Sequence, residues 1–327
     1  MKKYLFGLLI TSLVLLTFAC SPTSQPSSVS TDAPTDIPIP TPIGSPIQLK
    51  DGLGNILELT SPAQRIVSLA PANTEILFAL GAGSQVVGRE SFSDYPPEAQ
   101  QIKDVGGNFG QLDTETIVSL QPDLILASAL SSPEQVKGLQ DLGLKVFVLP
   151  NPVDFDGLYI NLLTVATLTG RTGEAQSLIN ALKTRIQAVE TKTSKLEQRP
   201  VVFYELDSTQ PDAPWTAGPN TFIDTLIKLA GGNNFGHELS GDWVQVSVEE
   251  IIRRQPDLIL LGDATWGGVT VESVAQRPGW NTLQAVQNEK VFVFDDNLVS
   301  RPGPRLVDGL EAMAALLQPQ LFPTVTP

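Results

Sequence analysis

Two closely spaced pairs of carboxylates are the residues whose types and spacing could support chemistry. Glu205 stands two positions before Asp207, and Asp295 is followed directly by Asp296. Such a pair could supply the acid and the base of a glycoside hydrolysis. Adjacent acids are nevertheless common where strands end, and spacing along the chain does not set the separation that this mechanism requires. A secreted carboxylate-dependent hydrolase is therefore only the last of the alternatives.

Other catalytic and metal-binding patterns are missing from the sequence. One His and one Cys exclude zinc ribbons, cages of several His, and an intramolecular disulfide. The single histidine, His237, is predicted to be an exposed loop residue. No nucleophile elbow, phosphate loop or metalloprotease motif occurs. We therefore predict that the chain is not an enzyme and that it has no catalytic or metal-binding residues.

Length and charge narrow the class further. A chain of 327 residues, 42% of them hydrophobic, is long enough for about two domains. Its formal charge of −14 is the opposite of what phosphate binding requires. Nucleic acid is therefore excluded as a partner.

The first 46 residues indicate export and membrane attachment. Lys2 and Lys3 precede an uncharged apolar run, 4–19, which is short for a membrane span and typical of a signal peptide. Cys20 follows at once and resembles the acylated cysteine of bacterial lipoproteins, although Thr17 replaces the usual Leu. We predict a signal peptide over 1–19 and a lipid-anchored Ser/Thr/Pro-rich tether over 20–46. An ordinary signal peptide followed by a spacer without an anchor is the alternative.

A repeated pattern predicts two similar α/β lobes. Residues 114–126 recur as 248–260, and each copy has a Gln-Pro-Asp turn between a short helix and an apolar strand. Asp113 and Ser247 are placed to cap the two helices. Short apolar strands that alternate with helices are typical of a mostly parallel sheet covered by helices.

The remaining segments complete the predicted architecture. Residues 47–59 predict a hairpin, and the strand over 65–70 leads to Asn73 as the cap of a helix. From Glu174 onward, apolar residues recur on one face of a helix about 23 residues long, after a kink at 170–173. We predict an N-terminal lobe over 47–153, an interlobe helix over 154–198 and a C-terminal lobe over 199–327, with one long rigid helix joining the lobes.

Several ordered motifs resemble one family. They are Ser-Leu-Ala-Pro-Ala-Asn-Thr-Glu (68–75), Phe-Ser-Asp-Tyr-Pro-Pro-Glu-Ala (92–99), the two Gln-Pro-Asp-Leu-Ile-Leu segments, Pro-Trp-Thr-Ala-Gly (214–218) and Asp-Trp-Val-Gln-Val-Ser (242–247). Over 47–318 the chain resembles the helical-backbone (class III) periplasmic binding proteins of ABC importers, and among them it is most similar to the cobalamin-binding component.

The resemblance implies how such a protein would work. A small-molecule ligand, here a cobalt corrinoid, would lie between the two lobes with little hinge closure, and no other cofactor is implied. The loaded protein would deliver it to the permease dimer of an ABC importer with its ATPase. The expected form is a monomeric lipoprotein at the outer face of the cytoplasmic membrane, in the periplasm or at the cell surface.

Glu115 and Glu249 are the docking residues that the resemblance implies. In the family, one glutamate on each lobe inserts into arginine clusters of the permease. The repeat places both carboxylates in the first turn of equivalent helices, which suits a two-fold symmetric receptor. The alternative explanation is that a glutamate at this position simply stabilises the helix dipole.

Ligand-facing residues are implied in both lobes. Phe92 and Phe109 fall where the family places aromatic residues against the corrin ring, and Tyr95 is placed to reach the rim of the cleft. Aromatic groups flanked by polar ones suit a large amphipathic ligand. The second lobe supplies Trp215, Trp243, Trp266 at the rim, Asn297 and Arg301. Packing in the core or in turns is the alternative for each aromatic residue, and a surface salt bridge is the alternative for Arg301.

Two departures from the cobalamin pattern leave other ligands open. Ser128 replaces a tryptophan, and Phe92 and Phe109 replace a tyrosine and a tryptophan. A ferric siderophore or haem in the same transport role is therefore the alternative. Siderophore pockets often carry several arginines, whereas the cleft segments offer Arg301, Arg89 and few others, so a corrinoid is preferred.

Overall fold

The computed structural model describes residues 46–107 and 111–323. It begins with the predicted hairpin, in which β1 (Ile47–Lys50) pairs antiparallel with β2 (Ile56–Leu59). Residues 1–45, which include the predicted signal peptide and Cys20, lie outside the described part, as does Phe109. Within the described ranges, no helix has the length and apolar character needed to cross a bilayer.

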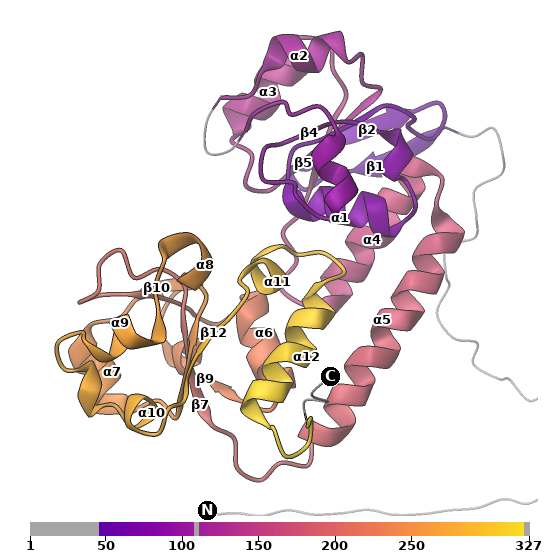
Figure 1. The fold of residues 1–327 in the computed structure, drawn as a ribbon. Coiled ribbons are helices and arrows are strands. Elements are labelled where there is room, and N and C mark those ends of the chain that lie inside the picture. The colour runs from indigo at the N-terminus through magenta and orange to yellow at the C-terminus, as the bar shows by residue number, and fades with distance from the viewer. Residues whose placement is uncertain (1–45, 108–110, 324–327) are drawn as a thin grey trace, which may run out of the picture. The chain divides into compact units, whose positions relative to one another are not determined.

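The first lobe is built on a four-stranded parallel sheet in the order β4-β3-β5-β6, of which β4 and β5 are labelled in Figure 1. Apolar clusters cover both of its faces, which explains why three of its strands are short, continuous apolar runs rather than alternating ones. The strands are β3 (Ile66–Ser68), β4 (Val86–Arg89), β5 (Leu124–Ser128) and β6 (Val146–Leu149), and the helical segments are α1 (Pro71–Ala79), η1 (Gly83–Gln85), η2 (Pro97–Gln101), α2 (Thr114–Ser119) and α3 (Pro133–Asp141).

The second lobe repeats this plan. Its parallel sheet has the order β12-β11-β7-β9, and a separate antiparallel pair is formed by β8 and β10. Figure 1 labels β7, β9, β10 and β12 of this lobe. The strands are β7 (Val201–Glu205), β8 (Trp215–Ala217), β9 (Asn233–Asn234), β10 (Trp243–Gln245), β11 (Leu258–Leu261) and β12 (Val291–Val293). The helical segments are α6 (Phe222–Leu229), η3 (Phe235–Glu238), α7 (Val248–Arg254), α8 (Ala264–Gly267), α9 (Val271–Ala275), η4 (Trp280–Thr282), α10 (Gln284–Gln287), α11 (Asn297–Ser300) and α12 (Leu306–Leu317).

The sequence repeat corresponds to a structural repeat. Asp113 and Ser247 cap α2 and α7 through their side chains, as predicted. Each helix is followed by a glutamine in the left-handed region, Gln121 and Gln255, both with φ of 47°. The Asp123 carboxylate then accepts the N–H groups of Gln64 and Arg65 just before β3, and Asp257 accepts the N–H of Val201 at the start of β7. The Pro-Asp turn therefore ties each helix to the beginning of a neighbouring strand.

The helical segment between the lobes contains two helices and not one kinked helix. α4 (Phe155–Thr169) ends at Gly170, whose φ of 73° lies in the left-handed region that favours glycine. The chain reverses there, as a contact between the two helices shows: Lys183 of α5 (Thr172–Thr193) lies 4.9 Å from the ring of Tyr159 of α4. The prediction of a single helix over 154–198 is thus corrected, while the long linking helix from Glu174 onward is confirmed as the 22-residue α5.

Asn73 does not cap α1 as predicted. The helix begins at Pro71, a residue that suits a first helical position because its φ is fixed and it has no N–H to satisfy. Asn73 instead lies within the first turn and donates from Nδ2 to the carbonyl oxygens of Leu126 and Ala127, at 3.1 and 3.0 Å. Its amide therefore holds α1 against the carboxyl end of β5.

One apolar cluster runs through both lobes. It joins Ile66 and Leu77 of the first lobe to Leu226 and Leu310 of the second through the buried faces of α4 and α5. Two separate clusters cover the outer faces of the two sheets. The predicted α/β class, with two similar lobes and mostly parallel sheets, is confirmed.

Candidate functional site

Five predicted ligand-facing residues are exposed aromatic side chains. Phe92, Tyr95, Trp215, Trp243 and Trp266 are between 36% and 55% exposed, and no other described Phe, Tyr or Trp is as exposed. Phe92 and Tyr95 follow β4, and Trp266 follows β11. Ligands of α/β proteins bind beyond the carboxyl ends of parallel strands. Because the five side chains are exposed, packing in the core does not explain them.

Trp215 and Trp243 lie on one face of the β8–β10 pair. Trp243 opposes Ala217 and Trp215 opposes Gln245, so the two indoles are diagonal neighbours. The pair is held close to the end of β7, because Trp215 donates its N–H to the carbonyl of Asp207 at 2.8 Å and accepts the N–H of Leu206 at 2.9 Å. The result is an aromatic surface anchored to the second-lobe sheet.

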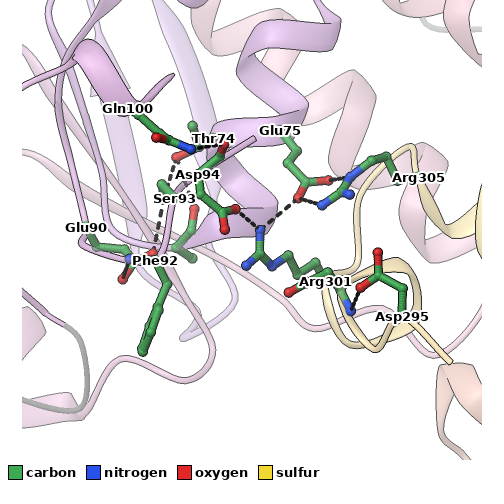
Figure 2. Close-up of polar contacts among 12 residues, drawn as sticks. Thr74, Glu75, Glu90, Phe92, Ser93, Asp94, Gln100, Asp295, Arg301 and Arg305 are labelled. Carbon is green, nitrogen blue, oxygen red and sulfur yellow. Dashed lines mark hydrogen bonds and ion pairs between the residues drawn. The ribbon is translucent and has the colours of Figure 1, made fainter. Parts of the chain in front are cut away.

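Four charged residues form an ionic cluster between the lobes, which we call the interlobe cluster: Glu75, Asp94, Arg301 and Arg305 (Figure 2). Arg305 binds Glu75 through two hydrogen bonds of 2.9 and 2.6 Å. Nη1 of Arg301 contacts Asp94 Oδ1 and lies 3.5 Å from Glu75 Oε1. Arg301, predicted as a ligand-facing residue, is therefore paired within the protein, and its side chain is only 12% exposed.

A hydrogen-bond network positions the segment that carries Phe92 and Asp94. Glu90 accepts the backbone N–H of Phe92 at 3.0 Å and the hydroxyl of Ser93 at 3.2 Å. Thr74 Oγ1 of α1 lies 2.9 Å from the same Ser93 hydroxyl. Figure 2 shows these residues together. These contacts connect the segment after β4 to the interior of the first lobe.

Burial and nearby guanidinium groups have opposite effects on the pKa of two carboxyl groups here. Burial raises the pKa of Glu90, against the opposing effect of its hydrogen bonds and of nearby Arg301 and Arg89. Partial burial of Asp94 would raise its pKa, but the hydrogen bond and charge of Arg301 outweigh this effect and lower the pKa. Arg301 therefore favours the charged form of Asp94.

The other predicted residues have defined places around this cluster. The Tyr95 ring lies 4.0 Å from the guanidinium carbon of Arg305, a cation–π contact. Asn297 begins α11, where its N–H donates to Asp295 at 3.1 Å. Arg89 is occupied with loop carbonyls, among them those of Ala99 and Glu90 at 3.0 Å.

Glu115 and Glu249 occupy matching exposed positions. Each lies in the first turn of its helix, α2 and α7 respectively, and neither is buried. The capping residues that precede them, Asp113 and Ser247, give the two helices the same start. The two carboxylates are thus exposed on related elements, and their docking role stays a prediction.

The carboxylate pairs considered for hydrolysis serve the fold instead. Glu205 is fully buried, and both of its oxygens bind Arg277. Asp296 accepts the hydroxyl of Tyr204 at 2.6 Å. Among the described residues, no group of three or more His, Cys, Asp or Glu side chains could hold a metal ion.

A hollow of about 740 Å³ lies away from the interlobe cluster, at the beginning of β7 and β9. His237 lines it together with Asp224, and its Nδ1 lies 3.0 Å from both oxygens of that carboxylate. His237 is exposed, as predicted, but it lies in η3 and not in a loop. His237 belongs to η3, which lies next to β8, because Asn234 just before η3 donates to the carbonyl oxygen of Ala217 at 2.8 Å.

Sequence reasoning missed the partners of Arg301. Glu75 and Asp94 were part of recognised motifs but carried no predicted role, and Arg305 was not selected. A signal was present for Glu75, because it directly precedes the apolar residues Ile76 and Leu77 of a predicted helix. A carboxylate that is buried with such neighbours rarely lacks a partner. The identity of that partner, which is 230 positions away, depends on the fold.

Comparison with known proteins gives consistent results. A family model described as periplasmic binding protein matches residues 66–298. The uncharacterized ABC transporter substrate-binding lipoprotein YvrC of Bacillus subtilis is 31% identical over 281 residues, covering 84% of this chain and 87% of the relative. The cobalamin-binding protein of Halobacterium salinarum is 31% identical over 274 residues, covering 81% and 72%.

A solved structure extends the similarity to the fold. The periplasmic heme-binding protein RhuT from Roseiflexus sp. RS-1, in its apo form, is 27% identical with a TM-score of 0.71, covering 79% of this chain and 99% of that one. The two relatives whose names state a ligand differ in it, cobalamin for one and heme for the other.

Proposed function

The chain belongs to the periplasmic binding protein family, and we propose that it is a lipid-anchored member that captures a corrinoid between its lobes and delivers it to an ABC importer. Members of this family bind solutes for transport rather than transform them, so the prediction that the chain is not an enzyme is confirmed. The relative named as a cobalamin-binding protein supports the choice of ligand.

The exposed aromatic residues carry this proposal. Planar side chains that stay partly exposed after folding present apolar surface, which a large amphipathic ligand can cover. The two tryptophans on one face of the β8–β10 pair offer such a surface in the second lobe. Phe92 and Tyr95 offer one in the first lobe, next to the interlobe cluster. Asn297 and Arg301 are the polar residues proposed to contact the periphery of the corrin.

Haem is the alternative ligand, and one residue favours it. Tyr95 is an exposed tyrosine in the segment after β4, and a tyrosine oxygen is one of the axial ligands of haem iron. The heme-binding structural relative supports the same possibility. A corrinoid remains our proposal because the arginines of the interlobe cluster are already paired with carboxylates of the protein, whereas haem propionates need cationic partners.

Titration calorimetry of the full chain tests the ligand directly. Cyanocobalamin and cobinamide are compared with haemin and with a ferric hydroxamate siderophore. Tight binding with one corrinoid per chain, weakened by Trp243→Ala and by Phe92→Ala, is the expected result. Binding of haemin or the siderophore in the absence of corrinoid binding would preserve the transport role and refute the corrinoid.

Docking is proposed to use Glu115 and Glu249. The double variant Glu115→Arg/Glu249→Arg should bind its ligand normally yet fail to stimulate the importer's ATPase, because like charges would then face the permease. Glu134→Arg is the matched control, since Glu134 is also exposed in the first turn of a helix but lies outside the repeat. Unchanged stimulation by the double variant would refute this role.

Attachment through Cys20 is proposed from its position after the apolar run and from the relative named as a lipoprotein. The mature protein would then lie at the outer face of the cytoplasmic membrane, in the periplasm or at the cell surface. We propose separately that it is a monomer. Labelled palmitate should be incorporated by the wild type and not by Cys20→Ser. Equal labelling of both proteins would exclude Cys20 as the anchor.

A further inference from the structure

The surroundings of Arg301 suggest how the site selects its ligand. Three carboxyl groups face this guanidinium: Asp94 and Glu75 by direct contact, and Glu90 as a near charge. Glu75 is also the bidentate partner of Arg305. Both arginines therefore already have carboxylate partners within the protein, so a ligand carboxylate entering here would compete with them.

Asp94 and Glu75 differ in what a ligand could do to them. The Glu75 side chain is 2% exposed and enclosed, and its bonds to Arg305 join α1 to the start of α12. The Asp94 side chain is 52% exposed, and the contact with Arg301 uses its Oδ1. Solvent, and hence a ligand, reaches Asp94 much more readily than Glu75.

Asp94 also lies among the exposed aromatic residues. Phe92 and Tyr95 precede and follow it in the segment after β4, while Arg301 comes from the segment after β12. The Asp94–Arg301 pair therefore joins the two lobes at the carboxyl ends of their sheets, where a ligand resting on these aromatic residues would present its polar edge.

We propose that Asp94 is a specificity-determining residue, which holds Arg301 so that the site accepts ligands carrying amide groups at this edge and rejects ligands carrying carboxylates. This inference rests on the proposed binding of a tetrapyrrole-like ligand. An amide has a donor for Asp94 and an acceptor for Arg301, so it can bind both without leaving either charge unpaired. A carboxylate has only acceptors, and it must either displace Asp94 from Arg301 or lie next to it.

Two corrinoids with the same ring provide the test. Dicyanocobinamide carries amides at its periphery, and dicyanocobyrinic acid carries carboxylates. Both are titrated into the full chain as the wild type, as Asp94→Asn and as Asp94→Asn/Arg301→Gln. Asp141→Asn is the matched control, because it removes the same charge from a first-lobe surface pair with Lys137. Thermal unfolding of each variant checks that it is folded.

The wild type should prefer the amide ligand. Asp94→Asn should increase the affinity for the acid by about tenfold or more, the size expected for a charge-assisted bond to the released guanidinium, with little change for cobinamide. The double variant should lose that gain, and Asp141→Asn should behave like the wild type. An unchanged preference in Asp94→Asn, or the same gain in Asp141→Asn, would overturn the inference.

Haemin separates this inference from the proposed function. If the wild type binds neither corrinoid, the corrinoid assignment fails, and the role of Asp94 is then judged on haemin with its two propionates. A gain in haemin affinity on Asp94→Asn that disappears in the double variant supports the role of Asp94. Equal haemin affinity in the wild type and in Asp94→Asn overturns the role of Asp94.

Discussion

Replacing Glu75 with Gln removes the carboxylate that both arginines of the interlobe cluster share. Its side chain is 2% exposed, and those of Arg305 and Arg301 are 14% and 12% exposed, so water cannot readily replace it. Removing one partner of a buried ion pair costs roughly 3–5 kcal/mol. Gln retains an acceptor oxygen and Arg301 retains Asp94, so we expect a loss of about 2–3 kcal/mol in the free energy of unfolding.

Urea unfolding of the full chain, followed by tryptophan fluorescence, measures this loss as a lower midpoint at an unchanged slope. Asp141→Asn is the control, because the exposed pair with Lys137 should contribute only about 0.3–0.5 kcal/mol. The double variant Glu75→Gln/Arg305→Gln should be less destabilised than the sum of the single variants, since it leaves no buried charge unpaired. A loss for Glu75→Gln no larger than that for Asp141→Asn would refute the reasoning.

Two further predictions concern burial and backbone approach. Burial, together with neighbouring Asp295 and Asp263, raises the pKa of Asp296 above 3.8 in spite of hydrogen bonds from Ser300 and Tyr204. Ionised Asp296 therefore costs stability as pH rises above 3.8, and urea unfolding should show the advantage of Asp296→Asn over the wild type growing from pH 4 to pH 7. Gly218→Ala should be strongly destabilising in the same assay, because its Cβ would lie 2.0 Å from the carbonyl oxygen of Gly241, whereas Gly138→Ala, with nothing within 4 Å on α3, should stabilise by about 0.5–1 kcal/mol. A pH-independent difference for Asp296→Asn, or equal effects of the two glycine variants, would contradict these expectations.

Local signals explain which parts of the fold were predictable. Each of the two Gln-Pro-Asp segments specifies a helix end, a turn and a buried strand within a few residues. The structure has these elements at both segments. The chain reversal at Gly170 was less accessible, because a glycine between two helical patterns fits a kink as well as a left-handed helix end. Only the packing of α5 back along α4 distinguishes the two.

The candidate site shows the same limit more strongly. The resemblance to the family's motifs pointed to the exposed aromatic residues by their positions in the sequence. The pairing of Arg301 depends on Asp94, which lies 207 positions away, and no local pattern connects the two. Sequence reasoning could thus name the arginine but not its partner, and the partner determines which ligand groups the arginine can accept.

The shared core suggests why single side chains would set ligand choice in this protein. Because one apolar cluster passes from the first lobe through α4 and α5 into the second, a large change in the angle between the lobes would break buried apolar contacts. The Glu75–Arg305 pair adds a nearly solvent-free polar contact between the same two lobes. A site held in this way cannot adapt its width freely to each ligand. Selection then depends on the charges that line it, and Asp94 is the accessible acid paired with Arg301 across the two lobes.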